Sequence, residues 1–248
     1  MVDIVLRSAA LITDEFIVSS KNAGGDLVTS IDYQIEKFLI EQINNKYPDY
    51  DIVSEEFNAD NKLTENCFVI DPLDGTINFA HGLPLWGIQM CQVSGGMCQV
   101  AVIHLPKLGE LYFANKSGAY RVKANFRKTN KVHNVGELLS KAERIQVSDK
   151  PADKALYLVE GGNKFPALAR LNKASRHWRY ICCTAVNSAW TACGRLGGTI
   201  LRKDNVWDYL PGQYLVQQAG GVIINKKGAH IAANSTELAR LLLRDGKV

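Results

Sequence analysis

The feature of this sequence that most constrains its fold is an apolar run that leads straight into carboxylates. Residues 67–70 read Cys-Phe-Val-Ile, and Asp71-Pro-Leu-Asp-Gly-Thr76 follows them directly. Asp-Pro and Asp-Gly steps commonly form turns, so such a string on its own could be a surface turn. Here it follows an apolar strand, and α/β proteins bind ligands at the carboxyl ends of their strands. We therefore expect a buried strand that ends in a functional turn.

This turn offers oxygen ligands and backbone amides close together. Asp71, the Leu73 carbonyl and Asp74 fall within one tight arc. Closely packed oxygen ligands suit Mg²⁺. The amides of Gly75 and Thr76 come next, and backbone amides suit an anion. The turn therefore suits a cation and an anion side by side.

Two weaker acidic signals lie elsewhere in the chain. Glu55-Glu56 follows a strand expected over residues 51–54, and such a pair is usually solvated. Asp208 falls in the first turn of a helix expected over residues 207–219, where a carboxylate ordinarily stabilises the helix dipole. Each signal has an ordinary structural explanation, so neither predicts a site by itself.

The pattern of the whole chain indicates a layered α/β protein. Helices and strands alternate in the second half, while the first half groups its strands. The polar, weakly patterned stretch from Asn125 to Asp153 suggests a boundary, so we expect two subdomains, residues 1–140 and residues 141–248. The expected helices cover residues 1–16, begin near residue 29, cover 166–173, begin after 183, and cover 207–219 and 236–243. The expected strands cover residues 51–54, 67–70, 86–93, 97–103, 112–114, 155–159, 199–201 and 222–224, with a hairpin turn at Gly95-Gly96.

Taken in order, these strings resemble the inositol monophosphatase family of lithium-sensitive magnesium phosphatases. The series is Asp26-Leu-Val-Thr-Ser-Ile-Asp32, Ser54-Glu-Glu56, Asp71-Pro-Leu-Asp-Gly-Thr-Ile-Asn-Phe79, Trp207-Asp208 and Ala219-Gly-Gly221. It covers most of the chain, and its last three strings are highly specific in this order. The resemblance implies an αβαβα sandwich of the sugar-phosphatase type and a Mg²⁺-dependent phosphomonoesterase.

The resemblance also implies a set of metal ligands, most of them in the N-terminal subdomain. Glu55, Asp71 and the Leu73 carbonyl would hold one Mg²⁺ ion. Asp71, Asp74 and Asp208 would hold a second, with Asp71 bridging, so the expected cofactor is two or three Mg²⁺ ions. Paired cations neutralise a phosphate dianion, lower the pKa of the attacking water and stabilise the leaving alkoxide. The ligand set therefore suits hydrolysis of a phosphate ester.

The implied catalytic pair is Asp32 and Thr76, which would orient and activate the attacking water. The amides of Gly75 and Thr76 would bind the phosphate. We expect direct attack without a phosphoenzyme. No cysteine-based phosphatase loop is present, and Asp71 and Asp74 are separated by two residues rather than one, unlike in the aspartyl-phosphate phosphatases.

Two departures from the family pattern leave the substrate open. Cys182-Cys183 stands where inositol-specific members have Gly followed by Ser or Thr. Leu201 stands where a glutamate grips inositol hydroxyls, and leucine cannot accept a hydrogen bond. We expect a small sugar or polyol phosphate, with fructose 1,6-bisphosphate or a 3′-phosphoadenosine nucleotide as alternatives. The candidate substrate-binding residues are Cys183, Thr184, Leu201, Arg202 and Lys203.

Charge is divided unevenly along the chain. Residues 1–80 hold 5 Lys and Arg against 15 Asp and Glu, while residues 81–248 hold 24 against 10. This fits an acidic cation site facing a basic wall, or simply two solvated faces. The one basic stretch with aromatic residues, Arg176–Tyr180, is too short to argue for nucleic acid. Some bacterial relatives of the family nevertheless act with RNA or the transcription machinery, so a regulatory protein with residual or no phosphatase activity stays open, as does a metal-binding protein without turnover.

Other features concern location and assembly. The first residues mix charged and apolar positions, unlike a signal or transit peptide. No apolar run reaches the roughly 18 residues of a membrane helix, so we expect no membrane partner. The six cysteines include no CxxC pair, so we expect free thiols, no zinc site and a cytoplasmic protein. The family resemblance suggests a homodimer.

Overall fold

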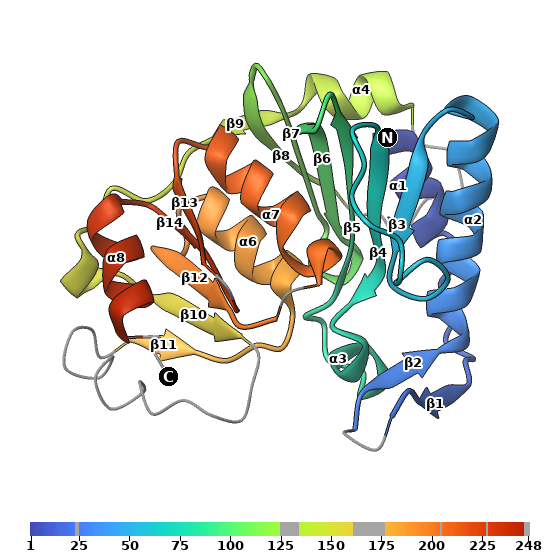
Figure 1. The fold of residues 1–248 in the computed structure, drawn as a ribbon, viewed down its shortest axis with the longest axis horizontal. Helices are drawn as coiled ribbons and strands as arrows, with labels where there is room; N and C mark the ends of the chain where they lie inside the picture. The colour runs from blue at the N-terminus through green and yellow to red at the C-terminus, as the bar shows by residue number, and fades with distance from the viewer. Residues whose placement is uncertain (23–24, 125–133, 161–176, 204, 227, 246–248) are drawn as a thin grey trace.

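A computed structural model describes residues 1–22, 25–124, 134–160, 177–203, 205–226 and 228–245. Helices and sheets alternate in five layers (Figure 1). The first layer holds α1 (Val2–Ala9) and α2 (Ser30–Lys46), the third holds α6 (Thr184–Ala192) and α7 (Val206–Gln218), and the fifth holds α8 (Thr236–Asp245). A seven-stranded sheet forms the second layer and a five-stranded sheet the fourth. The predicted αβαβα sandwich is confirmed.

The seven-stranded sheet holds the turn that the sequence singles out. β3 and β4 pair in parallel, and every later neighbour in this sheet is antiparallel. The hairpin predicted at Gly95-Gly96 joins β5 to β6. In order across the sheet, the strands are β3 (Asp51–Ser54), β4 (Cys67–Asp74), β5 (Gly87–Ser94), β6 (Met97–Leu105), β7 (Glu110–Asn115), β8 (Gly118–Lys123) and β9 (Glu143–Ile145).

The five-stranded sheet mixes parallel and antiparallel pairs. β10 pairs in parallel with β11 and β12, while β14 is antiparallel to β12 and β13. The helix expected over residues 166–173 lies outside the described residues. In order across the sheet, the strands are β11 (Trp178–Arg179), β10 (Tyr157–Glu160), β12 (Gly198–Leu201), β14 (Ala229–Ala233) and β13 (Val222–Lys226).

Several short elements were not expected from the sequence. β1 and β2 form a separate antiparallel ribbon, which the long-range pairing of Val18 with Thr29 holds together. The short elements are β1 (Val18–Ser20), β2 (Leu27–Thr29), α3 (Thr76–Ala80), α4 (Val135–Ser140) and the 3₁₀ turns Pro106–Leu108 and Ala152–Lys154.

None of the described helices combines the length and apolar character needed to cross a bilayer.

The first helix is shorter than its sequence pattern predicts. We expected it to reach Phe16, but α1 ends at Ala9. The amides of Leu11 and Ile12 bond to carbonyls three residues back rather than four, which tightens the last turn. The chain then leaves the helix, and the Phe16 ring packs against Phe79 with 4.8 Å between ring centroids. The segment after Ala9 thus carries Phe16 out of the helix and against Phe79.

The helix α2 follows its local signals closely. Thr29 caps it, and Asp32 completes a capping box by accepting a bond from the Thr29 amide. Ile35, Leu39 and Ile43 are fully buried, one turn apart, in the core between this helix and the seven-stranded sheet. Their spacing matches the helical repeat, so the same residues that predict the helix also fix which face it buries.

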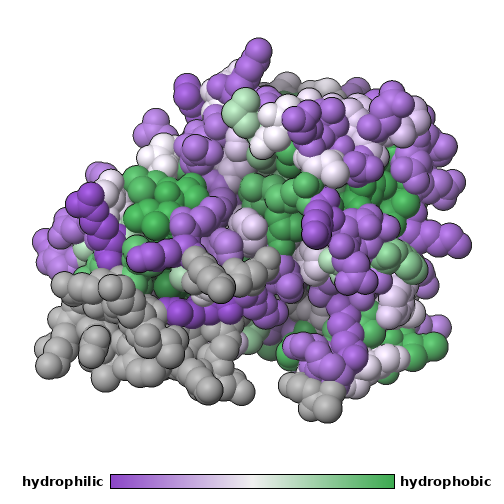
Figure 2. Space-filling model, viewed as in Figure 1, coloured by the Kyte–Doolittle hydropathy of each residue, from purple (hydrophilic) through white to green (hydrophobic). Residues whose placement is uncertain are grey.

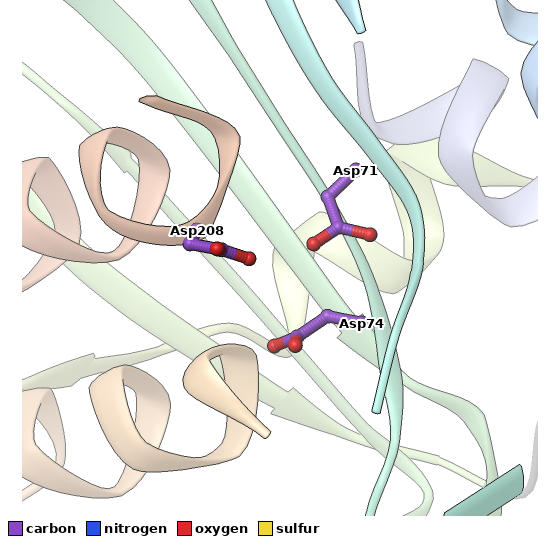
Figure 3. Close-up of side chains that lie close together, drawn as sticks. All are labelled: Asp71, Asp74 and Asp208. Atoms are coloured by element: carbon purple, nitrogen blue, oxygen red, sulfur yellow. The ribbon is translucent and has the colours of Figure 1, made fainter. Parts of the chain in front are cut away.

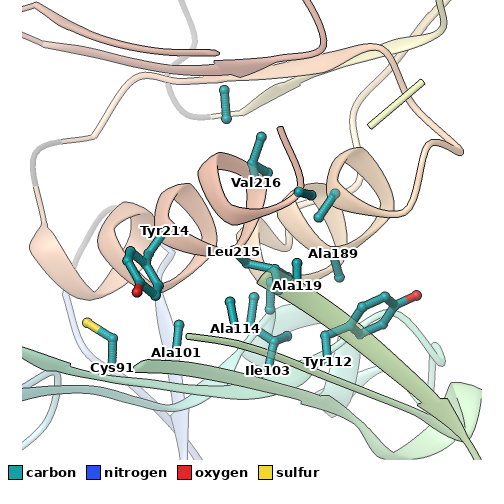
Figure 4. Packing of buried hydrophobic residues seen from close by; sticks show 14 of the residues in the cluster. Cys91, Ala101, Ile103, Tyr112, Ala114, Ala119, Ala189, Tyr214, Leu215 and Val216 are labelled. Atoms are coloured by element: carbon teal, nitrogen blue, oxygen red, sulfur yellow. The ribbon is translucent and has the colours of Figure 1, made fainter. Parts of the chain in front are cut away.

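The middle layer brings α6 and α7 close together over the sheet. A Cβ atom at Gly212 would lie 2.1 Å from the Ser188 hydroxyl oxygen, so only glycine permits this approach. Leu215 of α7 is buried against Ile103 and Ala114 of the sheet (Figure 4). On this side of the molecule, hydrophobic residues gather around the middle layer, and hydrophilic residues surround them (Figure 2). α7 is thereby packed against the seven-stranded sheet, and its first turn lies beside that sheet.

Candidate metal centre

Three aspartates from two elements meet beside the seven-stranded sheet (Figure 3). Asp71 and Asp74 end β4, and Asp208 lies in the first turn of α7. One carboxylate oxygen of each lies within 4.8 Å of the others, and all three residues are buried. Three buried oxygen ligands at this spacing suit a hard divalent cation such as Mg²⁺.

A β-bulge brings Asp71 and Asp74 to the same side. Asp71 pairs with Gln89 and Asp74 with Gly87, so three steps along β4 match two along β5. In a regular strand, residues three apart point to opposite faces. The extra residue re-aims one side chain, as bulges commonly do beside functional sites. Both carboxylates can then point toward Asp208.

The first turn of α6 holds Asp74 in place. Its Oδ2 accepts hydrogen bonds from the Thr184 hydroxyl at 2.9 Å, from the Cys183 thiol at 3.4 Å and from the Ala185 amide. The carboxylate thus caps a helix N-terminus, where negative charge is favoured. Two of the candidate substrate residues, Cys183 and Thr184, therefore contact a carboxylate of the cluster.

The Asp32 carboxylate and the Thr76 hydroxyl lie together beside this cluster. The Thr76 hydroxyl lies 3.2 Å from Asp32 Oδ1 and 3.0 Å from the Leu73 carbonyl oxygen, and it can donate to either. The other Asp32 oxygen accepts from the amide and hydroxyl of Thr29. Burial raises the pKa of Asp32, although these hydrogen bonds oppose the shift. The cap of α2 therefore also fixes the expected catalytic pair.

The carboxylates of the cluster repel one another when no cation is present. Burial, followed by the charges of Glu55, Asp74 and Asp208, raises the pKa of Asp71. Burial likewise raises the pKa of Asp208 to about 7, against the opposing charge of Lys203. Several negative charges in a buried pocket are stable only with bound protons or cations. The donor set therefore fits Mg²⁺.

Comparison with known proteins agrees with this geometry. A model of the inositol monophosphatase family matches residues 2–245. The chain belongs to the inositol monophosphatase family. Members of this family are Mg²⁺-dependent and bind small phosphorylated substrates.

The relatives within this family carry more than one name. A Thermotoga maritima protein named fructose-1,6-bisphosphatase/inositol-1-monophosphatase is 31% identical over 221 residues, which cover 88% of this chain and 78% of the relative. The Pasteurella multocida Nus factor SuhB is 29% identical over 215 residues, covering 86% of this chain and 77% of that protein. The structure of Thermotoga maritima IMPase superposes with a TM-score of 0.80 at 25% identity and covers 98% of this chain and 95% of its own.

Glu55, an expected metal ligand of the inositol monophosphatase pattern, lies outside the group of three aspartates. It is half-buried in the turn after β3, and its Oε1 accepts a bond from Lys21 Nζ at 2.8 Å. The same ammonium contacts Glu56 at 2.5 Å. The charge of Glu55 contributes to the raised pKa of Asp71 and of Asp208, so Glu55 lies near the cluster. Its role as a ligand stays a prediction.

Of the remaining candidate substrate residues, Leu201 and Lys203 lie near the cluster. Leu201 is buried and, with Asp208, lines a cavity of about 10 Å³, the size of one water molecule. Partial burial lowers the pKa of Lys203, but the charges of Asp208 and Asp74 outweigh it and raise that pKa, so Lys203 lies near these carboxylates. Burial lowers the pKa of Arg202. The full cavity lining is Thr184, Ser188, Thr199, Leu201, Asp208, Tyr209, Gln213, His230 and Ala232.

The pair Cys182-Cys183 takes a glycine-like backbone at the place where the family pattern has glycine. Cys182 has φ of +58°, the only positive value among non-glycine residues in the described part of the chain. An L-residue adopts this region with strain, so the position retains the backbone that glycine would favour. Cys67, Cys91, Cys98 and Cys193 are free thiols, in agreement with the prediction for those positions.

Gln89 is a site residue that the sequence pattern did not single out. Its amide nitrogen donates to Asp71 Oδ2 at 3.3 Å and to the Thr184 hydroxyl at 3.0 Å, and the residue is fully buried. Its Oε1 has no hydrogen-bond partner among the described residues. One signal was available, because Gln89 is a polar residue between the apolar Ile88 and Met90 in a predicted strand.

Proposed function

We propose that this chain is a Mg²⁺-dependent phosphomonoesterase that hydrolyses a small sugar or polyol phosphate by direct attack of water. The observation that carries the proposal is the meeting of Asp71, Asp74 and Asp208, buried within 4.8 Å of one another beside the Asp32–Thr76 pair. A pocket of buried, repelling carboxylates has a clear physical need for cations. Family membership supports the same chemistry.

Two or three Mg²⁺ ions would be held by the carboxylates of the cluster. Bound there, they would supply the positive charge that neutralises the phosphate dianion and the developing alkoxide. Glu55 and the Leu73 carbonyl would complete the ligand set. The residues proposed to hold the ions are Glu55, Asp71, Leu73, Asp74 and Asp208.

Thr76 and Asp32 would orient the attacking water and accept its proton. A Thr76 hydroxyl that donates to Asp32 Oδ1 keeps its lone pairs free to accept a hydrogen bond from that water. Burial raises the pKa of Asp32, which makes its carboxylate a better proton acceptor near neutral pH. The amides of Gly75 and Thr76 would bind the phosphate oxygens.

Two of the candidate substrate residues support an ester other than inositol 1-phosphate as the substrate. Leu201 offers no acceptor for a ring hydroxyl, and Lys203 lies near enough to Asp208 and Asp74 for their charges to raise its pKa. A cation there would attract a second anionic group. Cys183 and Thr184 would shape the wall beside Asp74, and Arg202, the neighbour of Leu201, would be a further substrate contact. We therefore propose a sugar phosphate or a bisphosphate, and a relative named as a fructose-1,6-bisphosphatase supports including that ester.

A phosphate-release screen tests the proposal. The panel contains myo-inositol 1-phosphate, fructose 1,6-bisphosphate, a hexose monophosphate and a 3′-phosphoadenosine nucleotide, each with Mg²⁺ or with a chelator. We expect release that requires Mg²⁺ and is fastest with an ester other than inositol 1-phosphate. Failure to release phosphate from every ester at saturating Mg²⁺ would overturn the proposal.

A second candidate function is regulatory. A relative named Nus factor SuhB and the excess of basic residues in 81–248 favour action with RNA or the transcription machinery. Mobility-shift titration with structured RNA at physiological salt tests this function, because phosphate contacts give salt-dependent binding.

We also propose that the protein is a cytoplasmic homodimer. Light scattering of the purified protein measures the mass of the particle and so tests whether it is a dimer.

A further inference from the structure

A carboxylate with no part in the proposed chemistry is buried directly behind Glu55. Glu36 lies on α2 with 0% of its surface exposed. Its Oε1 accepts hydrogen bonds from the Ser54 hydroxyl at 2.6 Å and from the Phe57 amide at 2.7 Å. Its Oε2 accepts from the Glu56 amide at 2.8 Å. One side chain thus satisfies three donors of a single turn.

These three bonds enclose Glu55 on both sides. Ser54, the last residue of β3, precedes it, and Glu56 and Phe57 follow it. The Glu56 and Phe57 amides donate to the Glu36 carboxylate, and backbone amides that are partly withdrawn from water need an acceptor. The Glu36 carboxylate supplies those acceptors. The hydrogen bonds to this one carboxylate therefore restrain the backbone on both sides of Glu55.

A packing role alone does not explain a carboxylate at this position. Burying a charge is unfavourable unless hydrogen bonds or an opposite charge compensate for it. Within the described part of the chain, no lysine or arginine lies within ion-pair distance of Glu36. Its compensation comes from the Ser54, Glu56 and Phe57 donors. The buried charge and the geometry of this turn therefore depend on each other.

The same helix also carries Asp32, one member of the expected catalytic pair. Asp32 lies one turn before Glu36 on α2, and its Oδ1 lies 3.2 Å from the Thr76 hydroxyl. Residues four apart share a helix face. One rigid helix therefore reaches both the turn after β4 and the turn after β3, so the positions of Thr76 and Glu55 are set by a common support.

We propose that Glu36 is a positioning residue that holds Glu55 in the orientation in which it completes the metal centre. This inference rests on the proposed function, because it assumes that Glu55 binds the cation. Lys21 contacts the Glu55 side chain but not its backbone, so it does not replace this support. Carboxylates that orient metal ligands in this way typically change metal affinity about 10–100-fold when they are mutated.

The test compares Glu36→Gln with Glu41→Gln, an exposed control on the same helix. Glutamine keeps the size of the side chain, but its amide nitrogen cannot accept, so at least one of the three donors loses its partner. In the metal-free protein, we expect faster hydrogen exchange at the Glu56 and Phe57 amides in Glu36→Gln alone. A calorimetric Mn²⁺ titration should show affinity about tenfold weaker in Glu36→Gln and unchanged in Glu41→Gln.

Turnover provides an independent readout. We expect the Mg²⁺ concentration for half-maximal phosphate release to rise about tenfold in Glu36→Gln. A merely structural role would lower the melting temperature without moving the Mn²⁺ affinity, and that result would overturn the inference. If Glu36→Gln does not fold, Glu36→Asp keeps the charge and shortens its reach, and wild-type Mn²⁺ affinity there would overturn it too.

The Mn²⁺ titration separates this inference from the proposed function. If the wild type releases no phosphate from any ester but Glu36→Gln weakens Mn²⁺ binding, the positioning role stands and the phosphatase proposal fails. If the wild type is an active phosphatase and Glu36→Gln binds Mn²⁺ as tightly as Glu41→Gln, only the positioning role fails.

Discussion

The Thr184 hydroxyl donates to Oδ2 of Asp74 at 2.9 Å, so the first residue of α6 holds a carboxylate at the end of β4. The same hydroxyl accepts a bond from Gln89, which also donates to Asp71. A single chain of hydrogen bonds therefore links two carboxylates of the cluster. Substitutions of the residues in this hydrogen-bond network should weaken metal binding more than they lower the stability of the fold.

Replacing Asp74 by asparagine should abolish nearly all Mg²⁺-dependent phosphate release while the protein stays folded. The asparagine oxygen can still accept the bonds from Thr184 and the Ala185 amide, but one ligand charge is lost. Turnover at saturating Mg²⁺ and a thermal melt of the metal-free protein should be measured together. Turnover at the wild-type rate would show that Asp74 is not a ligand.

Replacing Thr76 by alanine should lower kcat about 100-fold and change KM much less. Positioning of the attacking water acts mainly in the transition state. Thr76→Ser, which retains the hydroxyl beside Asp32, is the matched control and should keep most of the activity. A change in KM alone would mean that Thr76 only binds substrate.

Replacing Gln89 by leucine should raise the Mg²⁺ concentration for half-maximal activity about tenfold. The variant removes both donated bonds, and Asp71 loses one of the groups that orient it. Gln92→Leu, on the same strand but three residues away, is the control. Equal Mg²⁺ dependence in the two variants would refute a role for Gln89.

The metal-free protein should lose stability as the pH rises toward 8. The pKa of Asp208 is raised to about 7, against about 3.9 in an unfolded chain. The folded state thus binds a proton that the unfolded state releases, and this stabilisation is present below about pH 4 and lost through about pH 7. Asp208→Asn should therefore raise the metal-free melting temperature more at pH 8 than at pH 5. The same increment at both pH values would contradict the raised pKa.

Replacing Leu201 by glutamate should raise activity on inositol 1-phosphate relative to fructose 1,6-bisphosphate. Restoring an acceptor for a ring hydroxyl should change the ratio of kcat/KM values by about tenfold. Leu201→Met, which preserves volume and polarity, is the control and should leave the ratio unchanged. A wild type that already prefers inositol 1-phosphate by about tenfold or more would show that this interpretation of Leu201 is wrong.

Local sequence determined the elements whose signals lie within one segment. The strand at residues 51–54 forms as predicted, the turn at Gly95-Gly96 joins β5 to β6, and α2 begins at its Thr29 cap. These signals act between residues that are already close along the chain. The carboxylates at the end of β4 were recognisable for the same reason, because their spacing is itself the motif. The division at residue 140 stays a prediction.

Only the tertiary structure decided which distant side chains support those carboxylates. Glu36 reaches Ser54 across 18 residues, Gln89 reaches Thr184 across 95, and Thr184 reaches Asp74 across 110. The register of β4 against β5 and the packing of α6 and α7 on the sheet create these meetings. In the sequence, Glu36 is one polar residue on an amphipathic helix, and a buried carboxylate there makes sense only once the turn that it holds has been brought against it.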